Sequence, residues 1–284
     1  MREAGIIAGF ALRESLRRRV FLVVGLLTVA FLVLYGLGTW QLFDTVGNFD
    51  TPIKGVDAKI VAGATILGLA MFATLFLGTI LAVFLTLGAV RGDAERGLLQ
   101  PILVRPLRRR TVLLGRFAAA AGVCGVYVIL VFLAATVITR AFSGWWPDRL
   151  AVPALQLAAA VAIIAALSLG GSVLLASTAN GIAIFMLFGA GLTAGLLGQI
   201  GNALGSDTLD HVSTAVSWAL PFEALYQAAL SALTQDTVGF TRLAIQLGPF
   251  GGAQSAGPLL WPFVLAYLLA VGGAAAAAFA RRDL

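Results

Sequence analysis

The only histidine and some of the carboxylates of this chain, side chains that could bind a metal or exchange protons, lie in one polar connection, residues 203–258. That connection holds the only histidine, His211, and several carboxylates, among them Asp207 and Asp210. Intramembrane metalloproteases need a His-Glu-x-x-His motif, which a single histidine cannot supply. We therefore expect no catalytic residue and no metal site, and an exposed loop position is the favoured interpretation of His211. A membrane enzyme in which Asp207, Asp210 and His211 meet around a metal stays as an alternative.

Two kinds of energy-coupling site are absent from the sequence. A phosphate-binding P-loop ends in Gly-Lys-Ser/Thr, and neither Lys54 nor Lys59 follows a glycine. The predicted membrane spans have no Asp, Glu, Lys or His in their interior, whereas proton- and ion-coupled carriers generally need ionisable groups at membrane depth. The sequence therefore indicates no ATPase and disfavours a proton-driven carrier, although sodium sites built from carbonyls and hydroxyls stay open. The single cysteine, Cys124, is expected to be a small buried residue.

The elements that must position any site are membrane helices. The chain is 60% hydrophobic and 11% charged, with a mean hydropathy of +0.98, whereas soluble domains carry about 25% charged residues. Its apolar runs are long and lack the alternation of barrel strands, which predicts an all-α integral membrane protein. We expect a cytoplasmic helix at 1–19 and then one six-span transmembrane domain over 20–284, with spans at 20–42, 60–90, 111–139, 151–178, 180–202 and 259–280.

Positive charge sets the predicted orientation. Fourteen of the seventeen arginines lie in the first nineteen residues, in the loop 91–116 or at the C-terminal end. Cytoplasmic loops carry an excess of Lys and Arg, so both termini and this loop are expected on the cytoplasmic side of the cell (inner) membrane. We expect no cleavable signal at the N-terminus, because the arginines at 17–19 precede a full-length apolar span. The net charge of +6 is explained by this clustering and does not indicate nucleic acid.

The outer connection, 203–258, contains two apolar stretches too short to span, 212–220 and 221–233. Pro221 can open a helix, with Glu223 in its favoured first turn. We expect a pair of short re-entrant helices that dip back toward the outer leaflet. Four tryptophans fall near predicted outer ends, as an aromatic belt would place them: Trp145, Trp146, Trp218 and Trp261.

The loop 91–116 is the only substantial cytoplasmic surface through which a partner could supply energy. Asp93 is a plausible N-cap of a short helix that has Glu95 in its first turn. Leucines and an isoleucine paired at i, i+4 give it an apolar face: Leu98 with Ile102, and Leu99 with Leu103. From physics alone, an ATPase dock and a positively charged anchor on lipid headgroups are equally favoured.

The residues of this loop also resemble a known family. The run 95–116, Glu-Arg-Gly-Leu-Leu-Gln-Pro-Ile-Leu-Val-Arg-Pro-Leu-Arg-Arg-Arg-Thr-Val-Leu-Leu-Gly-Arg, is similar to the loop between spans two and three of type-2 ATP-binding-cassette (ABC) exporter permeases. The run 11–19 resembles the family's cytoplasmic elbow helix, and 279–284 resembles its C-terminal ending. The six-span layout also fits, so the resemblance covers the whole chain. With its long outer loop, the chain is also similar to the permease of the nitrous-oxide reductase maturation transporter.

The resemblance implies a half-transporter. Two membrane subunits, identical or related, pair with two cytoplasmic ABC ATPase subunits, which hold the ATP and Mg, and this chain binds no cofactor. The loop helix acts as the coupling helix, and Pro101 should bend it. The dimer seam would include Gly191 and Gly195, whose spacing otherwise fits intrachain packing equally well. The coupling residues that the resemblance implies are Asp93, Glu95, Gly97, Leu98, Leu99, Ile102, Leu103, Arg105, Pro106 and Arg109.

The sequence therefore predicts the permease subunit of an ABC exporter, in which a partner's ATP hydrolysis moves the spans mechanically. The uncharged interior of the predicted spans favours an amphipathic or lipophilic substrate. Two alternatives stay open beside the membrane enzyme. One is a secondary carrier or channel. The other is a membrane subunit that relays ATP-driven movement to a partner outside.

Overall fold

The computed structural model describes residues 19–46, 58–87, 109–147, 149–233 and 257–281. Within these ranges the chain forms eight helices and no strand, which confirms the all-α prediction. The helices are α2 (Arg19–Val46), α3 (Ala58–Thr86), α6 (Arg109–Ser143), α7 (Ala151–Leu174), α8 (Ser177–Leu204), α9 (Asp207–Ala219), α10 (Pro221–Leu233) and α12 (Leu260–Ala280).

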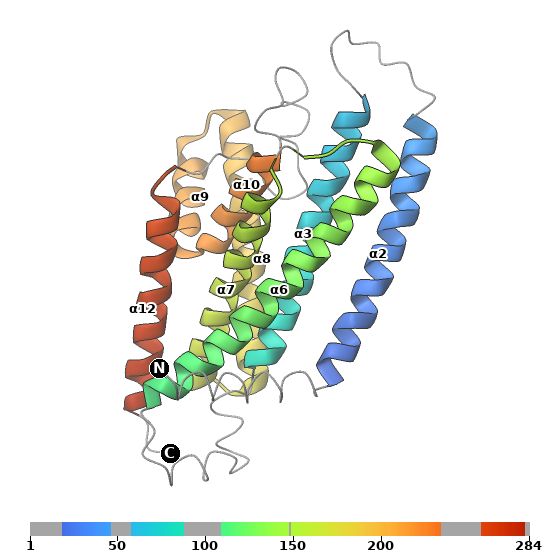
Figure 1. Cartoon of the computed structure of the whole chain (residues 1–284). Helices are drawn as coiled ribbons and strands as arrows, with labels where there is room; N and C mark the ends of the chain where they lie inside the picture. Colours follow the sequence, from blue (N-terminus) through green and yellow to red (C-terminus); the bar gives the residue numbers. More distant parts are fainter. Residues whose placement is uncertain (1–18, 47–57, 88–108, 148, 234–256, 282–284) are drawn as a thin grey trace.

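Six of these helices, all except α9 and α10, are long and apolar enough to cross a membrane, as the sequence predicted. They run alternately up and down in Figure 1, so that α2 begins and α12 ends at the lower end of the bundle. α6 has 35 residues, a length of about 52 Å, which exceeds the hydrocarbon core of about 30 Å. It crosses the bundle diagonally, as an over-long span must tilt or project to be accommodated.

The centre of the bundle is α7, which contacts α3, α6, α8, α10 and α12. Its buried side chains include Leu157, Ile163 and Ile164, and it has no charged residue. Gly78 of α3 shows how tightly three of these helices meet. A Cβ atom there would stand 2.5 Å from Cγ2 of Val128 in α6 and 2.9 Å from Cγ2 of Val161 in α7. Only glycine therefore fits this position without a shift of the helices.

Hydrogen bonds between polar side chains connect neighbouring helices of the bundle. The Tyr35 hydroxyl of α2 lies 2.6 Å from the Thr139 hydroxyl of α6. Thr86, at the end of α3, donates a hydrogen bond of 2.6 Å to Ser168 of α7. Asn180 donates from Nδ2 to the carbonyl of Ser168 at 2.9 Å, which fixes the short turn between α7 and α8. The lower ends of α3, α7 and α8 are therefore tied together by polar contacts.

The two short helices form a re-entrant pair, as predicted from Pro221 and Glu223. α9 folds back along α8. The two helices lie so close that a Cβ atom added to Gly198 would meet Ser213, and one added to Gly201 would meet Leu209. α10 then runs back up inside the bundle, against α7. Eleven of the thirteen residues of α10 are buried, whereas α9 has no buried residue. The sequence predicted a shallow pair, and the structure places α10 in the core.

The tip of this pair reaches well into the spanning region. Phe222 lies against Gly191, in the middle of α8, where an added Cβ would stand 2.5 Å from the phenylalanine ring. Gly191 is thirteen residues from the end of α8, or about 20 Å along the helix axis. The Tyr267 hydroxyl, in the second turn of α12, donates to the carbonyl of Ala219 at 2.8 Å. α10 is therefore a half-helix that starts inside the bundle.

Candidate functional site

Nearly all of the predicted coupling residues lie in 93–106, outside the described residues. Arg109 is the first residue of α6, and Arg116 follows two turns later in that helix. The loop between α3 and α6 thus joins the lower ends of two core helices (Figure 1). The coupling helix and the elbow helix at 1–19 stay predictions.

The two glycines assigned to the dimer seam, Gly191 and Gly195, are both buried within the chain. Gly191 gives room to Phe222 of α10, whose ring stacks on Phe188 of α8 with centroids 5.7 Å apart. The ring of Phe188 in turn lies beside the ring of Phe76 in α3, with centroids 6.0 Å apart. An intrachain role for Gly191 is therefore visible, while a role in a dimer seam stays a prediction.

His211 is exposed, as expected, and it lies on α9. Among the described residues, no three His, Cys, Asp or Glu side chains gather in a way that could hold a metal ion. Cys124 is fully buried, as predicted.

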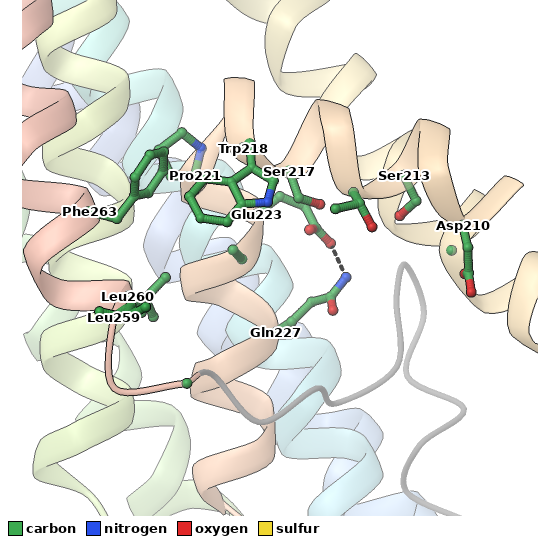
Figure 2. A pocket seen from close by; sticks show the side chains of 14 residues that line it. Asp210, Ser213, Ser217, Trp218, Pro221, Glu223, Gln227, Leu259, Leu260 and Phe263 are labelled. Atoms are coloured by element: carbon green, nitrogen blue, oxygen red, sulfur yellow. Dashed lines mark hydrogen bonds between the residues drawn. The ribbon is translucent and has the colours of Figure 1, made fainter. Parts of the chain in front are cut away.

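A polar cavity lies between the re-entrant pair and the start of α12, and it has a volume of about 570 Å³. Figure 2 shows hydroxyl and carboxyl side chains of α9 along one wall, with aromatic and aliphatic side chains opposite. The Trp218 ring meets Phe263 edge-on with centroids 4.6 Å apart. The lining residues are Gly198, Asp210, Ser213, Thr214, Ser217, Trp218, Pro221, Glu223, Ala224, Gln227, Gly257, Leu259, Leu260 and Phe263.

Glu223 is the residue of this cavity with the most unusual environment. Its side chain is 1% exposed, in the first turn of α10. Gln227, one turn later, donates from Nε2 to Oε1 of Glu223, while Oε2 has no hydrogen-bond partner among the described residues (Figure 2). Burial raises the pKa of this carboxyl from 4.5 to about 7, although the nearby polar side chains of Gln227 and Ser217 lower it. Glu223 is therefore poised to exchange a proton or to meet a cation near neutral pH.

Sequence reasoning missed this carboxyl as a group buried inside the bundle. The six spans indeed have no Asp, Glu, Lys or His in their interior, but α10 carries Glu223 into the bundle from the connection between spans. The signal that could have found it is the order Pro221, Glu223, Gln227. Proline opens a short helix, the carboxylate sits in its first turn, and an amide follows at i+4. Discontinuous helices of this kind form binding sites in membrane transporters.

A second cavity is entirely different in character. It has a volume of about 430 Å³, lies in the lower half of the bundle between α2, α3 and α8, and is lined by apolar side chains alone. Its walls include Val20, Leu27, Phe76 and Phe185. α2 and α8 are the first and fifth spans, and α8 carries Gly191 and Gly195, the glycines that the family resemblance assigns to the dimer seam.

Comparison with known proteins gives the family. No curated protein sequence matches the chain at a significant level. A family model described as "ABC-2 family transporter protein" matches residues 6–284, nearly the whole chain. Membership of this family implies a partner ABC ATPase subunit. Together with the six apolar helices, the match shows a membrane protein and an ABC transporter permease: the chain belongs to the ABC-2 family of transporter proteins.

Proposed function

We propose that the chain is the permease subunit of an ABC exporter. Two copies, or one copy and a related subunit, assemble with two cytoplasmic ATPase subunits, which bind ATP and Mg. The chain itself is not an enzyme and holds no cofactor. It moves an amphipathic or lipophilic substrate. The chain lies in the inner membrane, and both of its termini face the cytoplasm.

The observation that carries this proposal is the family match over residues 6–284 in a chain that lacks a P-loop. A permease of an ABC transporter does not need its own nucleotide site, because the ATPase is a separate subunit. The six apolar helices supply the membrane half of such a machine. The permease and the ATPase subunit could not drive transport separately. The energy of ATP hydrolysis must therefore enter the permease through a surface outside the bilayer.

The packing of the core supports a mechanical route from the loop 91–116 to the spans. This loop joins α3 to α6, and both helices meet α7 at Gly78 without room for a single added carbon. At its lower end α3 is also hydrogen-bonded to α7 through Thr86 and Ser168. Close-packed interfaces transmit displacement with little compression. A push on the loop therefore reaches α7, and through α7 it reaches α10.

The test is capture of the ATPase by the full-length permease in detergent. The double variant Glu95→Ala/Leu99→Asp places a charge on the apolar face of the coupling helix. We expect capture to fall more than about tenfold, because the interface would have to bury an unpaired carboxylate. The matched control is Asp207→Ala/Val212→Asp, the same kind of exchange on exposed positions of α9. Unchanged capture, ATPase activity and transport in the first variant would overturn the coupling-helix assignment.

The orientation is tested separately by labelling single cysteines. In a Cys124→Ala background, Arg149→Cys reports the upper end of the bundle and Ala176→Cys the lower end, and both positions are exposed. A membrane-impermeant maleimide should label position 149 in intact cells and position 176 only after the cells are opened. The reverse pattern would contradict cytoplasmic termini.

A second function is favoured by the buried carboxyl of Glu223, because ion-coupled carriers place such groups at membrane depth. Transport that persists in vesicles without any ATPase subunit, driven by a proton gradient alone, would establish the carrier. The relay of movement to an outer partner, which the similarity to the nitrous-oxide reductase maturation permease suggests, would instead require the segment 203–258 for complex formation without any transported solute.

A further inference from the structure

We propose that the cavity between α9, α10 and α12 binds an organic ammonium ion with an apolar body, with the Glu223 carboxylate as its counter-ion. As a statement about binding, the proposal stands on the geometry of this cavity. As a statement about cargo, it rests on the proposed export function, for which it names the substrate class.

The first argument is the unsatisfied charge of the site. Glu223 is 1% exposed, one of its oxygens accepts from Gln227, and Oε2 has no partner among the described residues. Burying a carboxylate away from water is costly unless it is paired and hydrogen-bonded. The described lining contains two carboxyls, Glu223 and Asp210, and no Lys, Arg or His. A cation that enters the cavity thus gains an ion pair and offsets a cost that the empty site carries.

The second argument concerns the kind of cation. An alkylammonium head has up to three N–H donors and no acceptor. Besides Oε2, the cavity offers three hydroxyl acceptors from one face of α9: Ser213, Thr214 and Ser217 (Figure 2). A hard metal ion would prefer several carboxylate or carbonyl ligands, and no cluster of three His, Cys, Asp or Glu exists among the described residues. The donor set therefore fits an ammonium group better than a bare metal ion.

The third argument is the apolar half of the cavity. Trp218 and Phe263 form an edge-to-face pair, and Leu259 and Leu260 stand beside them. Aromatic faces attract organic cations, and apolar walls suit a hydrocarbon body. The volume of about 570 Å³ lies within the range of about 300 to 1,000 Å³ typical of small-molecule sites. The cavity thus has a charged end and an apolar end, which match the ammonium group and the apolar body of the proposed ligand.

Among the described residues, few other ionisable groups face Glu223, so the pH behaviour of the site can be derived. α9 contributes Asp210 to the same cavity, α10 contributes Tyr226, and α12 contributes Tyr267. α7 and α8 have no ionisable residue. Lys59, at the start of α3, is seventeen residues or about 25 Å along that helix from Phe76, which lies near the α10 tip. Protonation of Glu223 is therefore the main event that competes with the cation.

The test is equilibrium binding of tritiated 2-phenylethylamine to the purified full-length chain in nanodiscs of neutral lipid. Saturable binding should appear, and uncharged 2-phenylethanol should not displace it. Affinity should rise about tenfold from pH 6 to pH 8, because a carboxyl with a pKa of about 7 must lose its proton to pair with the amine. Glu223→Gln should weaken binding at least about tenfold and abolish the pH dependence.

Two further variants make the result decisive. Asp207→Asn removes a carboxylate from the same helix pair at an exposed position outside the cavity, and it should leave binding unchanged. Ser217→Ala removes one acceptor and should weaken binding about tenfold to a hundredfold, the cost of one hydrogen bond to a charged group, which decides the matter if Glu223→Gln fails to fold. Equal binding by wild type and folded Glu223→Gln, or equal displacement by 2-phenylethanol, would overturn the proposal.

The two proposals fail separately. If the amine does not bind but the chain still captures its ATPase, the cation site is wrong and the permease function stands. If the amine binds with the expected pH dependence but no ATPase is captured through the loop 91–116, the cation site stands and the carrier alternative gains support.

Discussion

α9 and α10 are consecutive helices of thirteen residues each, and both carry an acidic residue in the first turn. None of the residues of α9 is buried, whereas α10 is almost wholly enclosed. The difference follows from their side chains. α10 has small residues at four positions that allow close packing against its neighbours, Ala224, Ala228, Ala229 and Ala232, and α9 has polar residues over much of its length. Only the carboxylate of α10 is consequently forced into the low-dielectric interior.

The contrast shows that the depth of a charge in this protein follows from how the helix that carries it packs in the bundle. Glu223 enters the bundle because Gly191 leaves room for the neighbouring Phe222. The cost of its burial is tolerated by the rest of the fold. Such a cost at one place is typical of a residue kept for function.

The largest effect we expect comes from ionisation of Glu223. Its pKa is raised from 4.5 to about 7 in the folded chain, so the protonated form stabilises the fold. That stability is fully present below pH 4.5 and is lost as the pH rises toward 7. The free energy of unfolding in mixed micelles should be lower by about 2 to 3 kcal/mol at pH 8 than at pH 5. Glu223→Gln should flatten this difference and Asp207→Asn should leave it, and a pH profile shared by all three proteins would refute the assignment.

The next effect compares one aromatic residue from each helix. Phe222→Ala opens a cavity among Phe188, Phe76 and α10 and should cost about 2 kcal/mol, chiefly through lost packing, because lipid removes much of the hydrophobic term. Trp218→Ala changes a side chain that is 56% exposed and should cost less than about 1 kcal/mol. Chemical unfolding of both variants provides the comparison. Equal losses would mean that α10 is no better packed than α9.

The third prediction concerns the space that Gly191 leaves for Phe222 at the start of α10. Gly191→Leu must displace the Phe222 ring and should cost about 1 to 2 kcal/mol through overpacking. Gly189→Leu, two residues earlier in the same helix, meets nothing within 4 Å and is the matched control. Thermal unfolding should separate the two variants. If Gly189→Leu is as harmful as Gly191→Leu, the intrachain contact does not explain the glycine.

The smallest effect concerns the turn between the two helices. Tyr267→Phe removes the hydrogen bond of 2.8 Å to the Ala219 carbonyl and should cost about 0.5 to 1 kcal/mol. The loss should appear as faster amide hydrogen exchange at 219–222 with no change at α7. Exchange that stays as slow as in the wild type would show that α12 does not hold the turn.

Much of this architecture could be predicted from the sequence because apolar length alone identifies a span. The six spans were found with end shifts of a few residues, and Pro221 marked the start of α10. The order Pro221, Glu223, Gln227 marks a short helix with a carboxyl in its first turn, but how deeply that carboxyl is buried depends on Phe222 meeting Gly191, thirty-one positions away in the chain. Its partner Gln227 and the hydroxyls of α9 come together only once the hairpin has folded. The predicted coupling residues 93–106 lie outside the described structure, so they stay a prediction.

The most direct test of this account is an infrared titration of the purified chain, followed at the carbonyl stretch of protonated carboxyl groups. A carboxyl buried on α10 predicts a band that disappears with a midpoint near pH 7 and is missing in Glu223→Gln. Asp207→Asn should keep the band. If every carboxyl of the wild type instead titrates near its ordinary value of about 4, the buried environment assigned to Glu223 is wrong.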